Sequence, residues 1–265
     1  MAKHVSDQEF LRYSAQIMLP EVGESGQLKL KNAKVLIVGM GGLGCPVSAY
    51  LAAAGVGNLV LMDDDKVELS NLQRQTIYQQ HQLKQAKVSA AATALKQQNP
   101  FIRIDALAQR FINNADCHKL VAAADIVIDC TDNMPTRQLI NRICVAEKTA
   151  LIVGAGIGFD GQLISFDANQ ADSACYHCLY PFSEDESEGQ QNCASLGVLG
   201  PVVAGIGSLQ ALEALKYIVG LELASFNRLI RFDAMSLRSQ HLLIAKNPEC
   251  HVCAQHKDKT DEIDR

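Results

Sequence analysis

A glycine-rich turn between an apolar segment and a helical segment is the first stretch of this sequence that indicates chemistry. Gly39, Gly41 and Gly44 have the spacing G-x-G-x-x-G, between the apolar run 35–38 and an alanine-rich segment that extends to about Ala54. Glycines let backbone N–H groups come close to a phosphate, and the N-terminus of the following helix adds a partial positive charge. The turn is therefore a candidate phosphate-binding site.

A carboxylate follows the next apolar segment, 59–62. Asp63 lies 19 residues after Gly44, where an acidic side chain in a nucleotide-binding βαβ unit accepts hydrogen bonds from the ribose. The glycine spacing alone is weak evidence. Because a strand precedes the turn, a helix follows it and an acid ends the next strand, the combination is strong evidence for a nucleotide.

Further polar residues follow the predicted elements and can complete such a site. Asn71 and Arg74 are three residues apart, so on one helical turn both side chains face the phosphate end of the glycine turn. Lys87 lies near the start of a helix predicted over 84–98, and Asp132 follows a predicted strand. A single cation on a helix face is usually only a solvated charge. Combined with acids at the strand ends, these cations favour a pocket for phosphates.

Two C-x-x-C motifs are the second strong pattern, and they consist of Cys175, Cys178, Cys250 and Cys253. A C-x-x-C turn places two sulfurs on one ion, and tetrahedral zinc takes four thiolates. A redox dithiol needs only one such pair, at a helix N-terminus, so the sequence favours zinc. Because the two motifs lie far apart in the chain, the site would fasten the end of the chain to its middle, which is a structural role.

Cys193 differs from the remaining cysteines. It closes the acidic, polar run 183–192, which is predicted to be a mobile loop, so its thiol is expected to be accessible. Its residue type fits a nucleophile and a bystander equally, because the sequence names no partner base. The other four, which fall within helix or strand patterns and fit buried, unreactive thiols, are Cys45, Cys117, Cys130 and Cys144.

The composition excludes several classes of protein. The chain has 265 residues, a net charge of -5 and a pI near 5.8, which argues against a protein built to bind nucleic acid. No charged, apolar and small-residue leader begins the chain, so we expect a cytoplasmic protein. The weakly charged run 197–212 contains Pro201 and several glycines, and we expect it to be a buried segment and not a membrane span.

The order of the predicted elements gives the fold class, α/β. Strands and helices alternate up to about residue 160, with the fifth strand expected at 151–153. This alternation predicts a Rossmann-like, doubly wound sheet that is parallel in its N-terminal half. After Gly161 the rhythm changes, and 162–166, 228–233 and 239–244 are predicted to be antiparallel additions in the C-terminal half, which carries the zinc motifs. We expect an N-terminal helical extension at 1–32, a nucleotide-binding half at 33–160, a second half of the same domain at 161–254, and a flexible tail at 255–265.

Taken in order, these motifs resemble the ThiF/MoeB/HesA family, bacterial relatives of ubiquitin-activating enzymes. The resemblance covers nearly the whole chain, to about residue 254. The segments 132–138, 158–163 and 192–198 look closer to ThiF, the thiamin branch, than to MoeB, the molybdopterin branch. The motifs that carry it are Arg12-Tyr13, the glycine turn at 39–44, Asp63-x-Asp65, Ser70-Asn71-Leu72-Gln73-Arg74-Gln75, Lys87, Cys130-Thr131-Asp132-Asn133 and the two C-x-x-C pairs.

The resemblance implies an adenylyltransferase that uses ATP and Mg²⁺. Family members adenylate the C-terminal glycine carboxylate of a small ubiquitin-fold sulfur carrier and release pyrophosphate; the carrier is ThiS-like in the thiamin branch and MoaD-like in the molybdopterin branch. Asp132 would hold Mg²⁺, Asp65 would act behind the nucleotide contacts, and the cysteine that matches Cys193 takes part in sulfur transfer in ThiF-like members. The expected nucleotide-binding residues are Gly39, Gly41, Gly42, Gly44, Asp63, Asp65, Asn71, Arg74, Lys87, Asp132 and Asn133.

The N-terminal helix departs from the family pattern. Members commonly read R-Y-x-R-Q, and the second arginine reaches the ATP phosphates of the neighbouring subunit; here Ala15 takes its place. Arg12 is kept, but its angular position on the helix is different. We therefore expect weaker γ-phosphate binding or a compensating basic group elsewhere. The apolar face of this helix and the habit of the family both favour a homodimer.

Two other classes of protein stay open. The glycine turn and Asp63 would also suit NAD, but no His/Arg/Asp set for hydride transfer is evident. In addition, Arg74, Lys87 and Asp132 supply more phosphate-binding groups than a ribose site needs. A non-catalytic adaptor that only holds a ubiquitin-fold partner is the third possibility, which the alanine at position 15 makes more credible.

Overall fold

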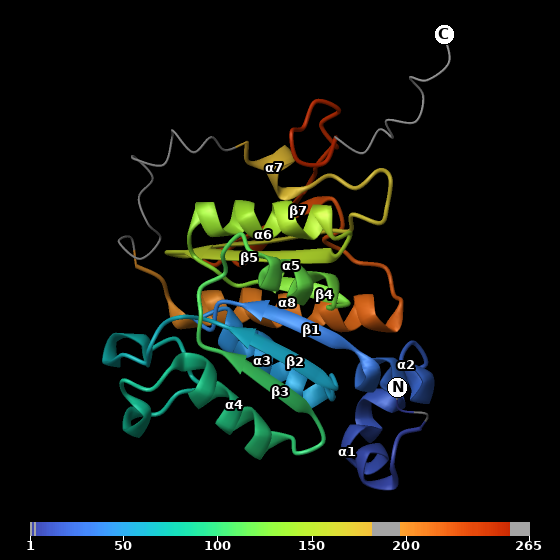
Figure 1. Cartoon of the computed structure of the whole chain (residues 1–265), viewed down its shortest axis with the longest axis vertical. Coiled ribbons are helices and arrows are strands. Elements are labelled where there is room, and N and C mark those ends of the chain that lie inside the picture. The colour runs from blue at the N-terminus through green and yellow to red at the C-terminus, as the bar shows by residue number, and fades with distance from the viewer. Residues whose placement is uncertain (1, 3, 182–196, 255–265) are drawn as a thin grey trace.

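The computed structural model describes residues 2, 4–181 and 197–254 of the chain (Figure 1). The predicted mobile loop at 183–192, Cys193 and the predicted tail at 255–265 lie outside these described residues.

One mixed sheet organises the described residues. Its strand order is β3-β2-β1-β4-β5-β6-β7-β8. The first five in this order run parallel, and β5, β6, β7 and β8 pair antiparallel to one another, which confirms the predicted fold class. The strands are β1 (Lys34–Val38), β2 (Asn58–Met62), β3 (Arg103–Leu107), β4 (Ile126–Asp129), β5 (Ala150–Ile157), β6 (Asp160–Phe166), β7 (Arg228–Asp233) and β8 (Arg238–Leu243).

Helices cover both faces of this sheet (Figure 1). Side chains alternate along β1, so Val35 and Ile37 join the apolar core beneath α3, α4 and α8, while Leu36 and Val38 join the core beneath α5 and α6. This two-sided burial explains the unbroken apolar run in the sequence. The helices are α1 (Asp7–Ile17), α2 (Gly23–Asn32), α3 (Gly44–Ala54), α4 (Lys87–Gln98), α5 (Ala115–Ala122), α6 (Met134–Ala146), α7 (Tyr176–Leu179) and α8 (Gly200–Val219), with short 3-10 turns η1 (Leu69–Asn71) and η2 (Gln80–Gln82).

The N-terminal helices pack at the edge of this core. α1 begins with a capping box in which Ser6 and Glu9 bond to each other's backbone N–H groups. Glu9 is also paired with Lys31 of α2 at 2.6 Å. The Tyr13 hydroxyl accepts a hydrogen bond of 2.8 Å from Asn99, at the end of α4. These contacts anchor α1 against α2 and the end of α4.

Two elements differ from their predicted bounds for local reasons. The helix predicted over 84–98 begins at Lys87, because Lys84 has φ +69°, a left-handed conformation that an α-helix does not contain. The strand predicted over 151–153 extends to Ile157, because it gains an antiparallel partner in β6. The hairpin with the next strand thus lengthens a strand that the sequence marks only by its apolar centre.

The apolar run after residue 197 forms the core of α8. Of the helices in the described ranges, α8 alone is long and apolar enough to cross a membrane, with a mean hydropathy of 1.4. Half of this helix is buried inside the protein, against α3, β5 and β6. It is therefore a core helix of the fold, as the sequence predicted.

Candidate functional site

A cavity of about 550 Å³ opens at the carboxyl ends of β1, β2 and β4. The strand order reverses between β1 and β4, and open α/β sheets bind ligands at such a reversal. The predicted nucleotide residues that line this cavity are Gly39, Gly41, Gly42, Asp63, Asp65, Asn71, Arg74, Lys87, Asp132 and Asn133. The structure therefore brings every predicted nucleotide residue except Gly44 to one place.

The glycines of the turn have different roles. Gly39 has φ +93°, and a Cβ there would lie 2.7 Å from the carbonyl oxygen of Cys130. A Cβ at Gly44 would lie 2.0 Å from the carbonyl oxygen of Gly39, so this glycine allows the turn to fold tightly onto α3 and does not line the cavity. A Cβ at Gly41, in contrast, would meet only Nε2 of Gln75, at an ordinary contact distance of 3.7 Å. A ligand can therefore approach the backbone at Gly41.

Asp63 is held at the end of β2 by two backbone N–H groups. Its carboxylate accepts hydrogen bonds of 2.6 Å from Met40 and 2.8 Å from Asp65. Burial raises the pKa of Asp63, although Lys87 and these hydrogen bonds oppose the rise. A carboxylate fixed in this way beside the glycine turn keeps lone pairs for the two hydroxyls of a ribose.

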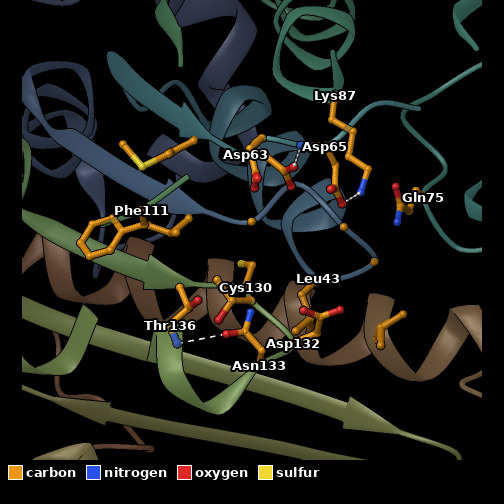
Figure 2. A pocket seen from close by; sticks show the side chains of 18 of the residues that line it. Leu43, Asp63, Asp65, Gln75, Lys87, Phe111, Cys130, Asp132, Asn133 and Thr136 are labelled. Atoms are coloured by element: carbon orange, nitrogen blue, oxygen red, sulfur yellow. Dashed lines mark hydrogen bonds and ion pairs between the residues drawn. The ribbon is translucent and has the colours of Figure 1, made fainter. Parts of the chain in front are cut away.

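Lys87 reaches the cavity from the first turn of α4. Its side chain is buried, and its Nζ lies 2.8 Å from Oδ2 of Asp65. The backbone N–H of Lys87 also donates to the carbonyl oxygen of Asp65 at 3.0 Å. Two separate bonds thus fix the start of α4 to the segment that follows β2. Figure 2 shows this ion pair on the same side of the cavity as Asp63.

Asn71 and Arg74 lie on one turn, as their spacing predicted. The backbone N–H of Arg74 donates to the carbonyl oxygen of Asn71 at 3.1 Å, and both side chains line the cavity. Asn71 also accepts a hydrogen bond of 3.2 Å from the backbone of Glu68. Arg74 donates to the carbonyl oxygen of Ser70 at 3.1 Å, and its Cδ would lie 3.6 Å from a Cβ at Gly42. The guanidinium is therefore close to the glycine turn.

The opposite wall of the cavity comes from β4 and the start of α6 (Figure 2). Asn133 caps α6 by accepting the backbone N–H of Thr136 at 3.0 Å. Asp132 is exposed, whereas Asp129 is buried and accepts two hydrogen bonds from Thr131. Arg137 donates to the carbonyl oxygens of Thr131 and, at 2.8 Å, Gly154. The loop that presents Asp132 is therefore fixed by its neighbours.

The apolar lining of the cavity could not be found from the sequence. Met62, Phe111 and Val203 belong to no motif and come from distant segments. Gln75, in contrast, ends the motif at 70–75, and it is buried beside Gly41 with an Oε1 atom that has no partner among the described residues. Thr136 and Val198 lie in the segments 132–138 and 192–198, but the sequence predicts no role for them.

The four cysteines of the C-x-x-C motifs form one cluster. The Sγ atom of Cys175 lies 3.9 Å from the Sγ of Cys178 and 3.7 Å from the Sγ of Cys250. The Sγ atoms of Cys178 and Cys253 are 3.4 Å apart. These distances are too long for disulfide bonds. Four sulfurs at about 2.3 Å from one zinc ion lie about 3.8 Å apart in a tetrahedron. The cluster therefore fits the predicted zinc site, and it joins α7 to the turn at 250–254.

The other described cysteines are buried free thiols, as predicted. Burial raises the pKa of Cys45 to about 12 and also raises the pKa of Cys130 and of Cys144. Cys117 is likewise buried and free. Thiols that stay protonated and shielded from solvent are poor nucleophiles, so these four positions carry no reaction.

In a comparison with known protein families, residues 13–252 match the ThiF family. The chain belongs to the ThiF family. It is 45% identical over 249 residues to the sulfur carrier protein ThiS adenylyltransferase of Escherichia coli (strain K12), covering 94% of this chain and 97% of that protein. It is 43% identical over 251 residues to the molybdopterin-synthase adenylyltransferase of the same organism, covering 95% and 99%.

The fold is also similar to that of solved structures. The crystal structure of E. coli MccB with ATP superimposes with a TM-score of 0.76 at 27% identity, over 87% of this chain and 69% of that one. Membership of the ThiF family confirms the resemblance that the motifs indicated.

The departure from the ThiF family pattern in α1 is visible in the structure. Ala15 is exposed on this helix. Arg12 donates to the carbonyl oxygen of Gln98, at the end of α4. Arg12 thus bonds within the same chain, and it does not line the cavity.

Proposed function

We propose that this protein is an ATP-dependent adenylyltransferase that activates the C-terminal glycine carboxylate of a small ubiquitin-like sulfur carrier. The observation that carries the proposal is the convergence of the glycine turn, Asp63, Arg74, Lys87 and Asp132 on one cavity. The names of two relatives with more than 40% identity over nearly the whole chain, both adenylyltransferases, support it. ATP use is further supported by the MccB structure, whose title pairs that protein with ATP.

The reaction needs little acid–base chemistry from the protein. A carboxylate is already ionised near neutral pH, so its oxygen attacks the α-phosphorus of ATP without a general base. The bond that forms joins this oxygen to the α-phosphorus, and the bond that breaks joins the α-phosphorus to the oxygen bridging to the β-phosphate. Pyrophosphate leaves with the electron pair of that bond. The site must therefore supply alignment and neutralise the charge on the leaving group.

The residues of the cavity divide this work. Asp63 binds the ribose hydroxyls, and the backbone at Gly41 and Gly42 lies under the phosphates. Arg74 and Lys87 place positive charge near the phosphates, and Asn71 adds a neutral hydrogen bond. The apolar side chains of Met62 and Phe111, near Asp63 in the same cavity, suit the base of the nucleotide.

Magnesium fits the opposite wall of the cavity. Asp132 offers an exposed carboxylate, and Mg²⁺ prefers such hard oxygen ligands while it keeps several waters. When bound, the ion neutralises charge on the phosphates. Asp63, Asp64 and Asp65 also lie close together, but Asp64 is paired with Arg110 at 3.1 Å and Asp65 with Lys87. We therefore assign Mg²⁺ to Asp132 and not to this acidic cluster.

The carrier is proposed to be ThiS-like, which places the enzyme in the synthesis of the thiazole of thiamin. The alternative is a MoaD-like carrier and molybdopterin synthesis. The carrier would contact the half of the domain at 161–254, and the enzyme would act as a homodimer in the cytoplasm. To test the carrier, each purified carrier is incubated with the enzyme and ATP–Mg²⁺, and its mass is measured. We expect a carrier–AMP adduct with a ThiS-like protein; an adduct with the MoaD-like protein alone would overturn the thiamin assignment.

Nucleotide choice tests the remaining classes of protein. Thermal stabilisation by ATP–Mg²⁺ but not by NAD is expected, because Arg74, Lys87 and Asp132 surround a longer phosphate chain than a dinucleotide offers at this end. Stabilisation by NAD alone would favour an oxidoreductase. Stabilisation by ATP with no adduct on any Gly-Gly carrier would favour a non-catalytic adaptor.

A further inference from the structure

α6 connects the nucleotide cavity with the cysteine cluster. Asn133 caps the beginning of this helix at the cavity. Near its end, Val145 packs in an apolar group with Cys175, Cys250 and Cys253. Between these ends, Asn141 faces the turn that carries the first C-x-x-C motif.

The side-chain amide of Asn141 is fixed and incompletely used. Its Oδ1 accepts the backbone N–H of Tyr176 at 2.8 Å, and Tyr176 directly follows Cys175 in the chain. The side chain is 1% exposed, and its Nδ2 has no hydrogen-bond partner in the described part of the chain. A buried N–H group without a partner costs on the order of 1–3 kcal/mol, so an unused donor at this position calls for an acceptor.

The sulfur of Cys175 is the neighbouring acceptor. Asn141 holds the backbone of Tyr176, the residue after Cys175, and its side-chain amide is next to the Cys175 thiol. Zinc binding turns this thiol into a thiolate, which is a stronger acceptor for an N–H donor.

We propose that Asn141 donates a hydrogen bond from Nδ2 to the sulfur of Cys175 when the cluster holds zinc, and so is a positioning residue of the metal centre. Four thiolates around one Zn²⁺ leave a net charge of −2, which N–H donors to sulfur disperse. Groups that hold metal ligands in place in this way change metal affinity by about 10- to 100-fold when removed. This role does not depend on the adenylation proposed above.

Asn227 provides a matched control on the other side of the same turn. It is also buried, its Oδ1 accepts the backbone N–H of Ala174 at 3.0 Å, and its Nδ2 donates to the carbonyl oxygen of Asp172 at 3.2 Å. Asn141 and Asn227 therefore fasten the residues on either side of Cys175, but only Asn141 has a free donor next to the sulfur.

The experiment compares zinc release from Asn141→Asp and Asn227→Asp. Both variants keep the acceptor for the backbone N–H and lose the amide donor. Zinc-loaded proteins are titrated with a coloured chelator, and the zinc dissociation constant is measured. We expect Asn141→Asp to weaken zinc binding about 10- to 100-fold and Asn227→Asp to change it less than about threefold. Equal losses in both variants, or unchanged zinc affinity in Asn141→Asp, would overturn the proposal.

A second pair separates the lost donor from the added charge. Asn141→Leu and Asn227→Leu both remove donor and acceptor without a new carboxylate beside the thiolates. We expect the leucine at 141 to weaken zinc binding more than the leucine at 227. In cobalt-loaded protein, the sulfur-to-metal charge-transfer band should shift for Asn141→Leu alone. An identical band and equal affinities in the two leucine variants would contradict the hydrogen bond to Cys175.

Discussion

The Nζ atom of Lys87 lies 2.8 Å from Oδ2 of Asp65, in an ion pair between a lysine side chain that is 6% exposed and an acid that is 66% exposed. The two ends of this pair therefore have unequal roles. The lysine is fixed by burial and by the start of α4, whereas the acid is open to water and to any ligand that enters the cavity. A phosphate can take the place of Asp65 beside Lys87 at little cost, because an ion pair with one exposed partner contributes at most about 1 kcal/mol.

This ion pair predicts that substitution of Lys87 lowers the adenylation activity far more than substitution of Asp65. Lys87→Met should lower kcat/KM for adenylation by about 30- to 1,000-fold, the equivalent of roughly 2–4 kcal/mol of transition-state stabilisation. Asp65→Asn should change it by no more than about fivefold, mainly through KM for ATP. Asp64→Asn is the matched control, since Asp64 forms an exposed pair with Arg110 and not with Lys87. Losses of equal size in the Lys87 and Asp65 variants would contradict this division.

Asp63 predicts a pH dependence of nucleoside binding. Burial raises the pKa of its carboxyl, so the proton is retained to a higher pH than in an exposed aspartate. The ionised form accepts both ribose hydroxyls, and adenosine affinity should therefore fall as the pH is lowered through the pKa of Asp63, at a higher pH than an exposed aspartate would give. Adenosine is the suitable probe because it has no phosphate that titrates. Calorimetry on Asp63→Asn should give weaker adenosine binding that does not depend on pH. If the affinity of this variant changed with pH as much as that of the parent protein, Asp63 would be excluded as the source of the pH dependence.

The local chemistry of the chain determined which parts of this account could be predicted. The unit from β1 to Asp63 could be predicted because its apolar strands, its glycine turn and its acid are all adjacent in the sequence. The four cysteines could be predicted as zinc ligands because the C-x-x-C spacing has few other uses. The nucleotide unit lies within one short segment, and each pair of cysteines lies within one C-x-x-C turn.

Other features depend on contacts between distant segments. Nothing in the sequence places Phe111 or Val203 in the cavity, because the pairing of β3 and the packing of α8 bring them there. The start of α4 is set by the left-handed backbone of Lys84, which is an unusual conformation for a lysine. The free donor of Asn141 is visible only once α6 lies against the cysteine cluster.

Cys193 tests whether sulfur transfer is separate from adenylation. It lies outside the described residues, and its predicted role rests on the family pattern alone. Cys193→Ala should leave ATP–pyrophosphate exchange within about twofold of the parent protein, because a carboxylate and not a thiol attacks ATP in that step. It should abolish sulfur incorporation into the carrier. Loss of the exchange reaction in this variant would show that the two roles are not separable.

Ala15 tests the departure from the family pattern. If an arginine from α1 of a second subunit normally reaches the phosphates, Ala15→Arg should lower KM for ATP by about three- to tenfold, as expected for one added charge-assisted hydrogen bond. Gln8→Arg adds the same charge two turns earlier on the same helix and should have no effect. Equal ATP affinity and adenylation rate in Ala15→Arg and the parent protein would refute the idea that this chain lacks a phosphate contact.

The central claim is that one cavity binds ATP and expels pyrophosphate when a carrier carboxylate arrives. Its most direct test is the exchange of radioactive pyrophosphate into ATP, measured with a Gly-Gly carrier and with the same carrier lacking its last glycine. We predict exchange that requires the intact carrier and falls about 30- to 1,000-fold in Arg74→Ala. Exchange that proceeds equally without the carrier, or that is undiminished in Arg74→Ala, would contradict the account.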